Sequence, residues 1–314
     1  MTRLPTGSPA TVPTPDIHGG DAAFVARALG LDPTSMLDLS ASLNPFAPDV
    51  SALAVAHLDS LVAYPDDRPA TRLLAMSLGV DPGRLVLTNG GAEAIALVAG
   101  HLGRGEVVEP EFSLYRRHLS VVEEGAGRWR SNPSNPLGVL AAPGETAAVW
   151  DEAFYALATG EWTRGDDEAW RLGSLTKLWA CAGLRLGYVI APDEAAAEAI
   201  RARRPRWSVN GLALSLVGPM LEATDLVGWS RDIADLRSRF SAGIAGLGLG
   251  VTESAANWVL VHEVAGLRER LAPRGIMVRD CTNFGLPGTV RIALPRAEHL
   301  DRVLTAIAAA TREN

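Results

Sequence analysis

The stretch 171-RLGSLTKLWACAGLRLGYVIAP-192 places a single lysine in the apolar, glycine-rich surroundings on which the fold and the chemistry depend. Lys177 lies close to two small hydroxyl residues after an apolar run, and Arg185 follows in a second apolar run. A lysine becomes a nucleophile when burial or nearby cations disfavour its charged form. The stretch alone is equally compatible with a lysine at a strand end whose ammonium group reaches solvent. The rest of the sequence has to distinguish the two.

Apolar runs typical of strands alternate with helical patterns around this stretch. The expected strands cover 85–89, 105–112, 146–154, 169–174 and 186–192. The expected helices cover 91–100, 113–124 and a segment that begins after Asp193. Strands and helices that alternate in this way form βαβ units, so the sequence predicts an α/β fold with a mostly parallel sheet.

The pattern changes after about residue 210. A helix-favouring stretch reaches about residue 247, and it is followed by two strand patterns and two helical patterns, at 257–264, 289–295, 265–275 and 297–314. This region is expected to form a second, smaller α+β domain. The expected division is an N-terminal arm with a first helix at 22–31 (1–37), a large domain (38–215) and a small C-terminal domain (216–314).

The composition excludes several classes of function. The chain has 314 residues, 47% of them hydrophobic, and a formal net charge of -7, which argues against a nucleic-acid partner. No apolar run approaches the roughly 20 residues of a membrane span, and the N-terminus lacks the apolar core of a secretory signal. Cys181 and Cys281 suggest neither a disulfide framework nor a zinc motif, and the histidines lack metal-ligand spacing. We therefore expect a cytoplasmic protein without a metal site.

Five other positions carry chemistry-bearing residues, each with an ordinary structural alternative. Glycines in 88-TNGGAEAI-95 can present backbone N–H groups to an anion, or form an ordinary tight turn. Asp151 and Phe112 end strand patterns, where a carboxylate can pair with a protonated ring nitrogen and an aromatic can stack on a flat ring; a helix cap and a core aromatic are the alternatives. Asn135 in 131-SNPSNPLG-138 can contact a ligand oxygen or shape a turn. Arg291, inside a strand pattern, needs an anionic partner from protein or ligand.

Taken together, these residues meet the demands of pyridoxal 5′-phosphate, and their order along the chain resembles the fold-type I pyridoxal-phosphate-dependent aminotransferases of class I/II. The resemblance covers nearly the full length and implies an aspartate aminotransferase-like fold. It is nearest to the threonine-phosphate decarboxylases of cobalamin synthesis and the histidinol-phosphate aminotransferases. It implies that Lys177 forms the covalent link to the cofactor and that Asp151 pairs with the pyridinium nitrogen.

The resemblance also assigns the remaining contacts. Arg185, Ser174 and Thr176, with the N–H groups of Gly91 and Ala92, would hold the cofactor phosphate. Asn135 would contact the ring hydroxyl oxygen, Phe112 would stack on the ring, and Arg291 would bind the substrate carboxylate. The implied partner of Tyr64, in the YPDDR stretch, is the phosphate site of a second subunit, so a homodimer is expected.

Four stretches are similar to the decarboxylase subgroup: 18-HGGD-21, 38-DLSASLNPFAP-48, 205-PRWSVNGLA-213 and 283-NFGLPGTVRIALP-295. His18 and Asn44, from the first two, are predicted substrate contacts; a phosphorylated substrate would need a second anion site, for which His18, Arg3 or another arginine are candidates. Phe154 stands where histidinol-phosphate aminotransferases usually have a tyrosine, which weakens but does not exclude the aminotransferase alternative.

Two departures from the family concern the substrate pocket. The segment between Gly138 and Asp151 is short, as though a helix had been lost, and Ala156 and Leu157 replace an acidic–aromatic pair. A non-catalytic binding protein of the same fold is a further alternative, although the chain keeps Lys177 and carries no appended basic domain.

Overall fold

The computed structural model describes residues 11–15 and 18–312. They form two compact units. The larger unit comprises Leu43–Arg237 and Ser254–Asn257, and the smaller one contains the described residues up to Ser42, Ser238–Glu253 and the described residues from Trp258 onwards. The domain boundaries expected after residues 37 and 215 stay predictions. Much of the predicted N-terminal arm, including Arg3, lies outside the described residues.

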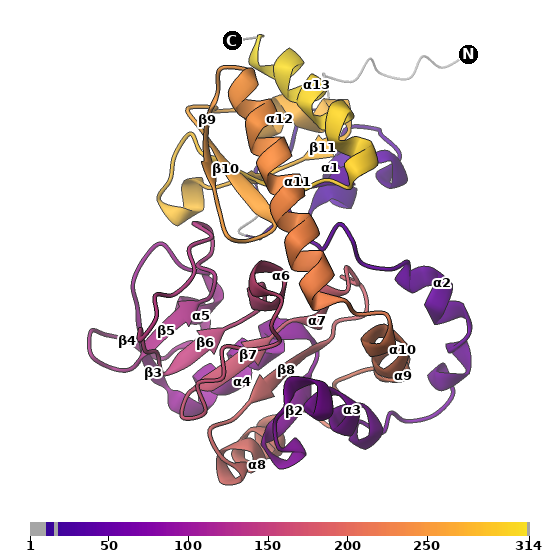
Figure 1. Ribbon diagram of the computed structural model, residues 1–314, viewed down its shortest axis with the longest axis vertical. Helices are drawn as coiled ribbons and strands as arrows, with labels where there is room; N and C mark the ends of the chain where they lie inside the picture. The colour runs from indigo at the N-terminus through magenta and orange to yellow at the C-terminus, as the bar shows by residue number, and fades with distance from the viewer. Residues whose placement is uncertain (1–10, 16–17, 313–314) are drawn as a thin grey trace, which may run out of the picture. The chain divides into compact units, whose positions relative to one another are not determined.

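The larger unit is built on a seven-stranded sheet with the order β2-β8-β7-β6-β5-β3-β4 (Figure 1). Pairs from β7 to β4 are parallel, whereas β8 runs antiparallel to both its neighbours. The strands are β2 (Leu85–Thr88), β3 (Arg104–Val107), β4 (Val121–Val122), β5 (Arg128–Ser131), β6 (Val149–Asp151), β7 (Trp170–Gly173) and β8 (Gly187–Ile190). The predicted mostly parallel α/β sheet is confirmed.

The helices of this unit follow the predicted pattern with differences in length. The expected helix over 113–124 is too long: α5 ends at His118, because the next residues form β4, which pairs with β3. The long helical region after residue 210 is divided among three helices. The helices are α2 (Val50–Val55), α3 (Arg68–Leu78), α4 (Gly90–Leu102), α5 (Leu114–His118), α6 (Tyr155–Thr159), α7 (Leu175–Leu178), α8 (Glu194–Arg203), α9 (Gly211–Ser215), α10 (Val217–Glu222) and α11 (Leu226–Gly246), the last continuing into the smaller unit.

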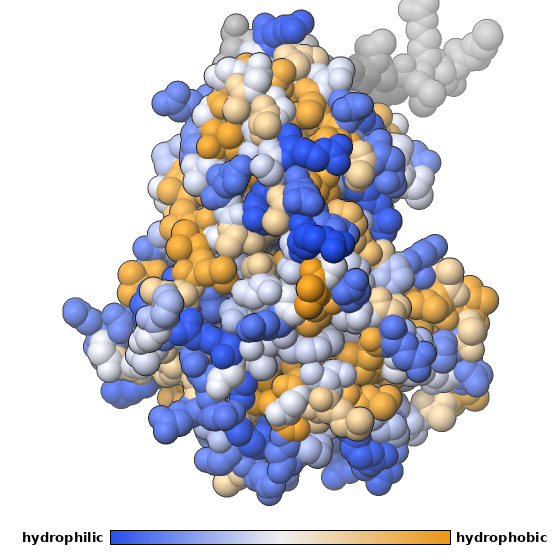
Figure 2. All heavy atoms as spheres, viewed as in Figure 1, coloured by the Kyte–Doolittle hydropathy of each residue, from blue (hydrophilic) through white to orange (hydrophobic). Residues whose placement is uncertain are grey.

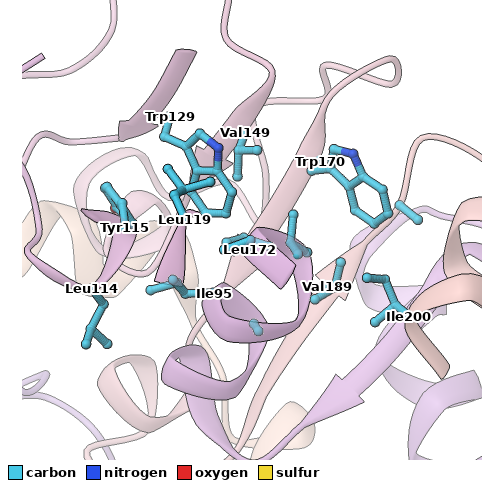
Figure 3. Packing of buried hydrophobic residues seen from close by; sticks show 14 of the residues in the cluster. Ile95, Leu114, Tyr115, Leu119, Trp129, Val149, Trp170, Leu172, Val189 and Ile200 are labelled. Atoms are coloured by element: carbon cyan, nitrogen blue, oxygen red, sulfur yellow. The ribbon is translucent and has the colours of Figure 1, made fainter. Parts of the chain in front are cut away.

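One face of the sheet packs on α4, α5 and α8 to form the main core (Figure 3). Trp129, Val149 and Trp170 are register partners on β5, β6 and β7 and are all buried. Because side chains alternate along a strand, this row of apolar residues turns one face of the sheet into the core. Ile95 of α4 and Ile200 of α8 pack in the same cluster.

The opposite face of the same strands carries a row of charged and aromatic residues. Arg130, Trp150 and Arg171 are register partners and are buried. Parallel strands are usually joined by a crossover helix that covers such a face, but the described segment 132–148 between β5 and β6 forms no helix. Instead, the guanidinium carbons of Arg130 and Arg164 lie 5.9 Å and 4.7 Å from the centre of the Trp150 ring.

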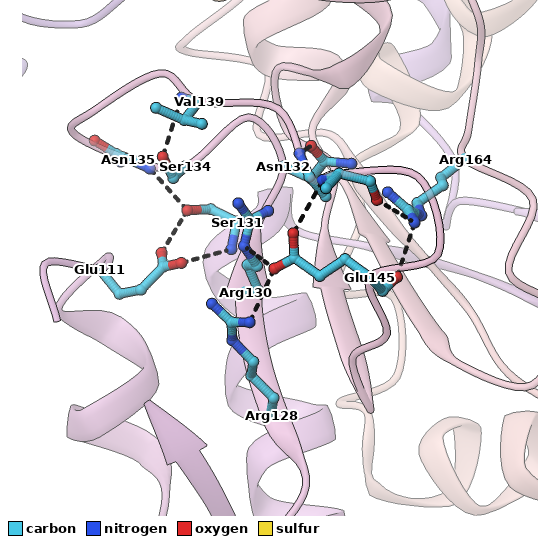
Figure 4. Close-up of polar contacts among 12 residues, drawn as sticks. Glu111, Arg128, Arg130, Ser131, Asn132, Ser134, Asn135, Val139, Glu145 and Arg164 are labelled. Atoms are coloured by element: carbon cyan, nitrogen blue, oxygen red, sulfur yellow. Dashed lines mark hydrogen bonds and ion pairs between the residues drawn. The ribbon is translucent and has the colours of Figure 1, made fainter. Parts of the chain in front are cut away.

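An acid completes this layer. Glu145, from the same segment, binds Arg128 and Arg130 at 2.8 Å each (Figure 4). Arginine side chains stacked on Trp150 thus cover the strands where a helix would otherwise lie, and Glu145 balances their charge. The sequence prediction missed β5 itself, since its two arginines interrupt the apolar pattern.

The smaller unit combines a four-stranded sheet, β12-β13-β10-β9, with a two-stranded parallel sheet, β1-β11. The predicted α+β character is visible in its elements, although α1 ends earlier than expected, at Ala28. They are β1 (Leu37–Asp38), β9 (Gly250–Glu253), β10 (Trp258–His262), β11 (Ile276–Met277), β12 (Arg279–Asp280), β13 (Val290–Ala293), α1 (Ala22–Ala28), α12 (Leu267–Leu271) and α13 (Leu300–Thr311). Among the described residues, no helix combines the length and the apolar character needed to cross a membrane.

Glycines allow three backbones to meet in the larger unit. A Cβ atom at Gly187, the first residue of β8, would lie 2.6 Å from the carbonyl carbon of Gly90, 2.7 Å from the nitrogen of Gly91 and 2.8 Å from the oxygen of Gly173. All three are backbone atoms, so no side chain can move aside to make room. The start of α4, the end of β7 and the start of β8 therefore touch only because residue 187 lacks a side chain.

We expect Gly187→Ala to destabilise the protein by about 1–3 kcal/mol or more, since overpacking against backbone forces a shift of the main chain. The free energy of unfolding in urea measures the effect. Gly183→Ala, in the loop just before β8, is the matched control: nothing lies within 4 Å of its added Cβ, so we expect a change of no more than about 0.5 kcal/mol. Equal stabilities of the two variants would contradict the close contact.

Candidate functional site

The predicted cofactor contacts gather at one edge of the seven-stranded sheet. Strands β2, β3, β5, β6 and β7 run in the same direction and end at this edge, because β8 is antiparallel to both β2 and β7. Ligands of α/β folds bind at the carboxyl ends of such strands. Each of these five strands is followed, or ended, by one predicted residue: Gly91, Phe112, Asn135, Asp151 and Lys177.

The first turn of α4 faces two of the predicted phosphate ligands. A Cβ atom at Gly90 would lie 2.5 Å from Nη2 of Arg185, and one at Gly91 would lie 3.5 Å from Cβ of Ser174. Arg185 itself has a φ of +58°, an uncommon conformation for a residue with a side chain. Together with the N–H groups that are free of helix bonds at the start of α4, these side chains form a cradle for an anion such as phosphate. Ala92 lies in the same turn.

Two other predicted ligand contacts, Thr176 and Asn44, form hydrogen bonds that hold α7, the helix that contains Lys177. The hydroxyl of Thr176 donates to the carbonyl oxygen of Leu186 (3.2 Å) and accepts from its amide (3.3 Å). Asn44 donates its side-chain amide to the oxygen of Leu178 (2.9 Å) and its backbone amide to the oxygen of Lys177 (3.1 Å). These bonds fix α7 at both ends. The predicted contacts of Thr176 with phosphate and of Asn44 with substrate stay predictions.

Lys177 and Asp151 bring opposite charges to the site. Nζ of Lys177 lies 6.0 Å from the centre of the Phe154 ring. Asp151 accepts hydrogen bonds from the Tyr115 hydroxyl (2.8 Å) and the Ala153 amide (3.0 Å). Burial raises the pKa of Asp151, while these two hydrogen bonds and the positive charge of Lys177 lower it. A cationic group placed against Asp151 would therefore favour its ionised form.

The sequence analysis missed a second buried acid, Glu111, next to Phe112. Its carboxylate accepts from the amide (3.1 Å) and from the hydroxyl of Ser131 (Figure 4). Burial raises the pKa of Glu111 to about 8; the hydrogen bonds from Ser131 oppose the shift, and the negative charge of Asp151 adds to it. The stretch 109-EPEF-112 shows an acid beside the aromatic, but it cannot show that the acid is buried against β5.

The smaller unit holds a pair of buried arginines on neighbouring strands. Arg279 on β12 is the register partner of Arg291 on β13. Arg291 donates to the oxygen of Ser40 (3.1 Å), and Arg279 donates to Oδ1 of Asn283 (3.0 Å). Burial lowers the pKa of Arg291 to about 10, with a further lowering from the charge of Arg279 and an opposing effect of Cys281. Two adjacent buried cations favour an anionic ligand.

Sequence reasoning identified only one member of this pair, Arg291. Arg279 could not be chosen because the pairing of β12 with β13 brings it to Arg291 from twelve positions earlier in the chain. His18, the other predicted anion contact, is half-buried in the same unit.

Tyr64 lies on the surface of the larger unit. Its side chain is 79% exposed, and its ring lies 4.6 Å from that of Trp207, centre to centre. Apolar side chains gather over α2 in Figure 2. The exposed large apolar residues of α2, α3 and the segment between them are Val55, Leu58, Leu61, Val62, Tyr64, Leu73 and Met76.

Comparison with known proteins gives a family match. The model of the family described as aminotransferase class I and II matches residues 129–307, more than half of the chain. Threonine-phosphate decarboxylase of Salmonella typhimurium is 29% identical over 92% of this chain and 95% of that protein. Histidinol-phosphate aminotransferase 2 of Pseudomonas aeruginosa is 28% identical over 94% of both chains.

Solved structures share the fold. The histidinol-phosphate aminotransferase from Clostridium acetobutylicum has a TM-score of 0.77 at 22% identity and covers 89% of this chain and 100% of its own. The enzyme of the same name from Sinorhizobium meliloti, in complex with pyridoxal 5′-phosphate, has a TM-score of 0.75 at 19% identity, covering 87% and 90%. The aspartate aminotransferase from Thermotoga maritima has a TM-score of 0.71 at 19% identity, covering 92% and 95%. The predicted aspartate aminotransferase-like fold is confirmed.

Proposed function

Since the chain belongs to the aminotransferase class I and II family, a family of enzymes that use pyridoxal 5′-phosphate, we propose that it decarboxylates L-threonine O-3-phosphate, a step of cobalamin synthesis. The observation that carries the proposal of catalysis is the position of Lys177. It is the only lysine in a chain with 29 lysine and arginine residues, and it lies at the strand edge with its charge toward Asp151. A positive charge alone could be supplied by arginine; a nucleophilic amine could not.

The residues around Lys177 fit the cofactor. Arg185, Ser174 and the first turn of α4, with Gly91 and Ala92, would hold its phosphate, and Thr176 would add a hydroxyl. Asp151 would pair with the pyridinium nitrogen. Phe112 would stack on the ring and Asn135 would contact its hydroxyl oxygen.

The bound cofactor supplies a protonated ring that accepts the electron pair of a bond broken at the substrate α-carbon. Asp151 would support this chemistry by keeping a negative charge against the ring nitrogen. Lys177 would hold the cofactor covalently, and its amine would deliver a proton to the substrate α-carbon after CO₂ has left. The same amine would remove the α-proton if the enzyme were an aminotransferase.

The arginine pair of the smaller unit is proposed to bind the substrate anions. Arg291 would fix the α-carboxylate, as the family resemblance implies. Arg279 stands beside it in register, so a substrate with a second anionic group would be bound more favourably than one with a single carboxylate. His18 and Asn44 remain further candidates for substrate contacts.

The choice between decarboxylation and transamination rests on a smaller set of observations. Relatives of both kinds match at 29% and 28% identity, so identity does not distinguish them. The aromatic ring near Lys177 is Phe154, which has no hydroxyl, and four stretches resemble the decarboxylase subgroup. These features favour the decarboxylase. Transamination of histidinol phosphate is the second candidate.

Lys177→Ala should abolish covalent attachment of the cofactor and catalysis while leaving the fold intact. The wild-type protein is incubated with pyridoxal 5′-phosphate, reduced with borohydride and weighed intact by mass spectrometry. Because the chain contains no second lysine, a single cofactor adduct on the wild type that is missing from the variant assigns the attachment to Lys177. Persistence of the adduct, at an unchanged melting temperature, would disprove this role, as would a wild type that takes up no cofactor.

The reaction is tested by supplying the holoenzyme with L-threonine O-3-phosphate and no oxo acid. We expect repeated turnovers that release CO₂ and aminopropanol phosphate in equal amounts, with Lys177→Ala as the inactive control. A parallel reaction contains histidinol phosphate and 2-oxoglutarate. Glutamate formation in the second reaction, with no CO₂ in the first, would replace the decarboxylase by an aminotransferase.

We further propose that the enzyme is a homodimer in which Tyr64 reaches the phosphate site of the second subunit. The high exposure of Tyr64 and of the apolar residues on α2 and α3 supports a partner at this surface. A cytoplasmic location and the absence of nucleic-acid partners stay predictions.

Co-expression of two inactive variants tests the dimer. Tyr64→Ala and Lys177→Ala are each expected to lose most activity as homodimers. A mixed dimer contains one site with both residues intact, so co-expression of differently tagged chains should restore part of the activity in the doubly tagged fraction. A monomer in analytical ultracentrifugation, or a mixed dimer without activity, would contradict the proposal.

A further inference from the structure

We infer that Glu111 is a positioning residue that acts through Ser131 to hold Phe112 and Asn135 in place for the cofactor ring. The functional part of this inference rests on the proposed function, because Phe112 and Asn135 are its predicted ring contacts. Glu111 would act without touching the cofactor itself.

The contacts form a continuous chain between two loops. Glu111 lies in the loop between β3 and α5, directly before Phe112. Its Oε1 accepts from the backbone amide of Ser131 (3.1 Å), and its Oε2 accepts from the Ser131 hydroxyl. The Ser131 oxygen in turn accepts from the backbone amide of Asn135 (2.8 Å). Figure 4 shows these three residues joined in one line.

Burial makes these hydrogen bonds hard to replace. Glu111 is 5% exposed, Ser131 is 3% exposed and Asn135 is 8% exposed, so water cannot easily replace a lost partner. A buried polar group that loses its hydrogen bond keeps the full cost of its desolvation. Removing either Glu111 or Ser131 should therefore release both loops, rather than exchange a protein contact for a water contact.

The hydrogen bonds from Glu111 through Ser131 to Asn135 form a tie between the two loops, and Glu111 is uncharged in this tie. Burial and the negative charge of Asp151 on β6 disfavour an ionised Glu111, and the Tyr115 hydroxyl on α5 interacts with it as well. The positive charge of Arg130 on β5 acts in the opposite direction.

With a pKa of about 8, Glu111 holds its proton at neutral pH. In that form Oε2 carries the proton and donates to the Ser131 oxygen along the same line, and the negative charge next to the ring nitrogen is left to Asp151. Burial raises the pKa of Asp151 as well, but its hydrogen bonds from Tyr115 and Ala153 and the positive charge of Lys177 lower it. Different neighbours can thus give two adjacent acids different roles.

Glutamine resembles a protonated glutamate in shape and in its polar groups: its amide oxygen can accept from the Ser131 amide, and its Nε2 can donate to the Ser131 oxygen. Glu111→Gln should therefore keep the tie, while Glu111→Ala and Ser131→Ala should break it. If Ser131 only filled space, Ser131→Ala would behave like the wild type.

The first measurement needs no cofactor. Amide hydrogen exchange of the apo protein reports on the Asn135 N–H, which donates to Ser131. We expect faster exchange at Asn135 in Glu111→Ala and Ser131→Ala, and wild-type exchange in Glu111→Gln. Glu145→Gln is the matched control, since Glu145 also binds side chains of β5; it should lower the melting temperature without changing exchange at Asn135. Wild-type protection of Asn135 in Glu111→Ala would overturn the tie.

The second measurement uses the holoenzyme. Glu111→Ala and Ser131→Ala should each weaken binding of pyridoxal 5′-phosphate about tenfold, the effect of losing one buried hydrogen bond, and should shift the absorbance maximum of the bound cofactor. Because the two residues act as a unit, the double variant should be no weaker than the weaker single variant. Additive losses, or an unchanged absorbance maximum, would overturn the positioning role. A wild type that binds no cofactor would disprove the proposed function instead, and the exchange experiment would still decide the tie.

Discussion

The close approach of three backbones at Gly187 is the constraint on which the rest of the site depends. The start of α4, the end of β7 and the start of β8 meet there at distances that exclude any side chain. The same contact places the first turn of α4 next to Ser174 and Arg185. The position of the anion cradle is therefore set by main-chain packing at Gly187. The side chains of Ser174 and Arg185 then complete the cradle.

The lysine is held by tertiary bonds more than by its own helix. Helix α7 has only four residues, far fewer than a helix needs to be stable alone. Thr176 fastens its first turn to Leu186, and Asn44 binds the carbonyl groups near its end. Leu186 directly precedes Gly187, the first residue of β8. The cradle and the helix that contains Lys177 are thus connected through two adjacent residues of the chain.

Sequence patterns predicted the parts of the site that follow strand ends, and they missed the parts that depend on register. The apolar runs before Asp151 and Lys177 revealed strands, and glycines after β2 revealed the start of α4. By contrast, β5 was not predicted because Arg128 and Arg130 interrupt its apolar pattern, and charged residues are rarely buried unless they are paired. Glu111 and Arg279 were missed for a related reason. Their roles come from neighbours on other strands, Ser131 and Arg291, and no spacing along one chain contains that information.

The alternation of side chains explains how the chain can lack a crossover helix near its site. On β5 and β6, Ser131 and Asp151 point to the same face as Trp129 and Val149, the face covered by α4 and α5. The missing helix affects the opposite face, where Arg130 and Trp150 lie. The layer of Arg130, Arg164 and Trp150 closes that face, so the shortening does not reach the side chains that are predicted to contact the cofactor ring. The same alternation puts Glu111 and Tyr115, which come from the covered face, in contact with Ser131 and Asp151.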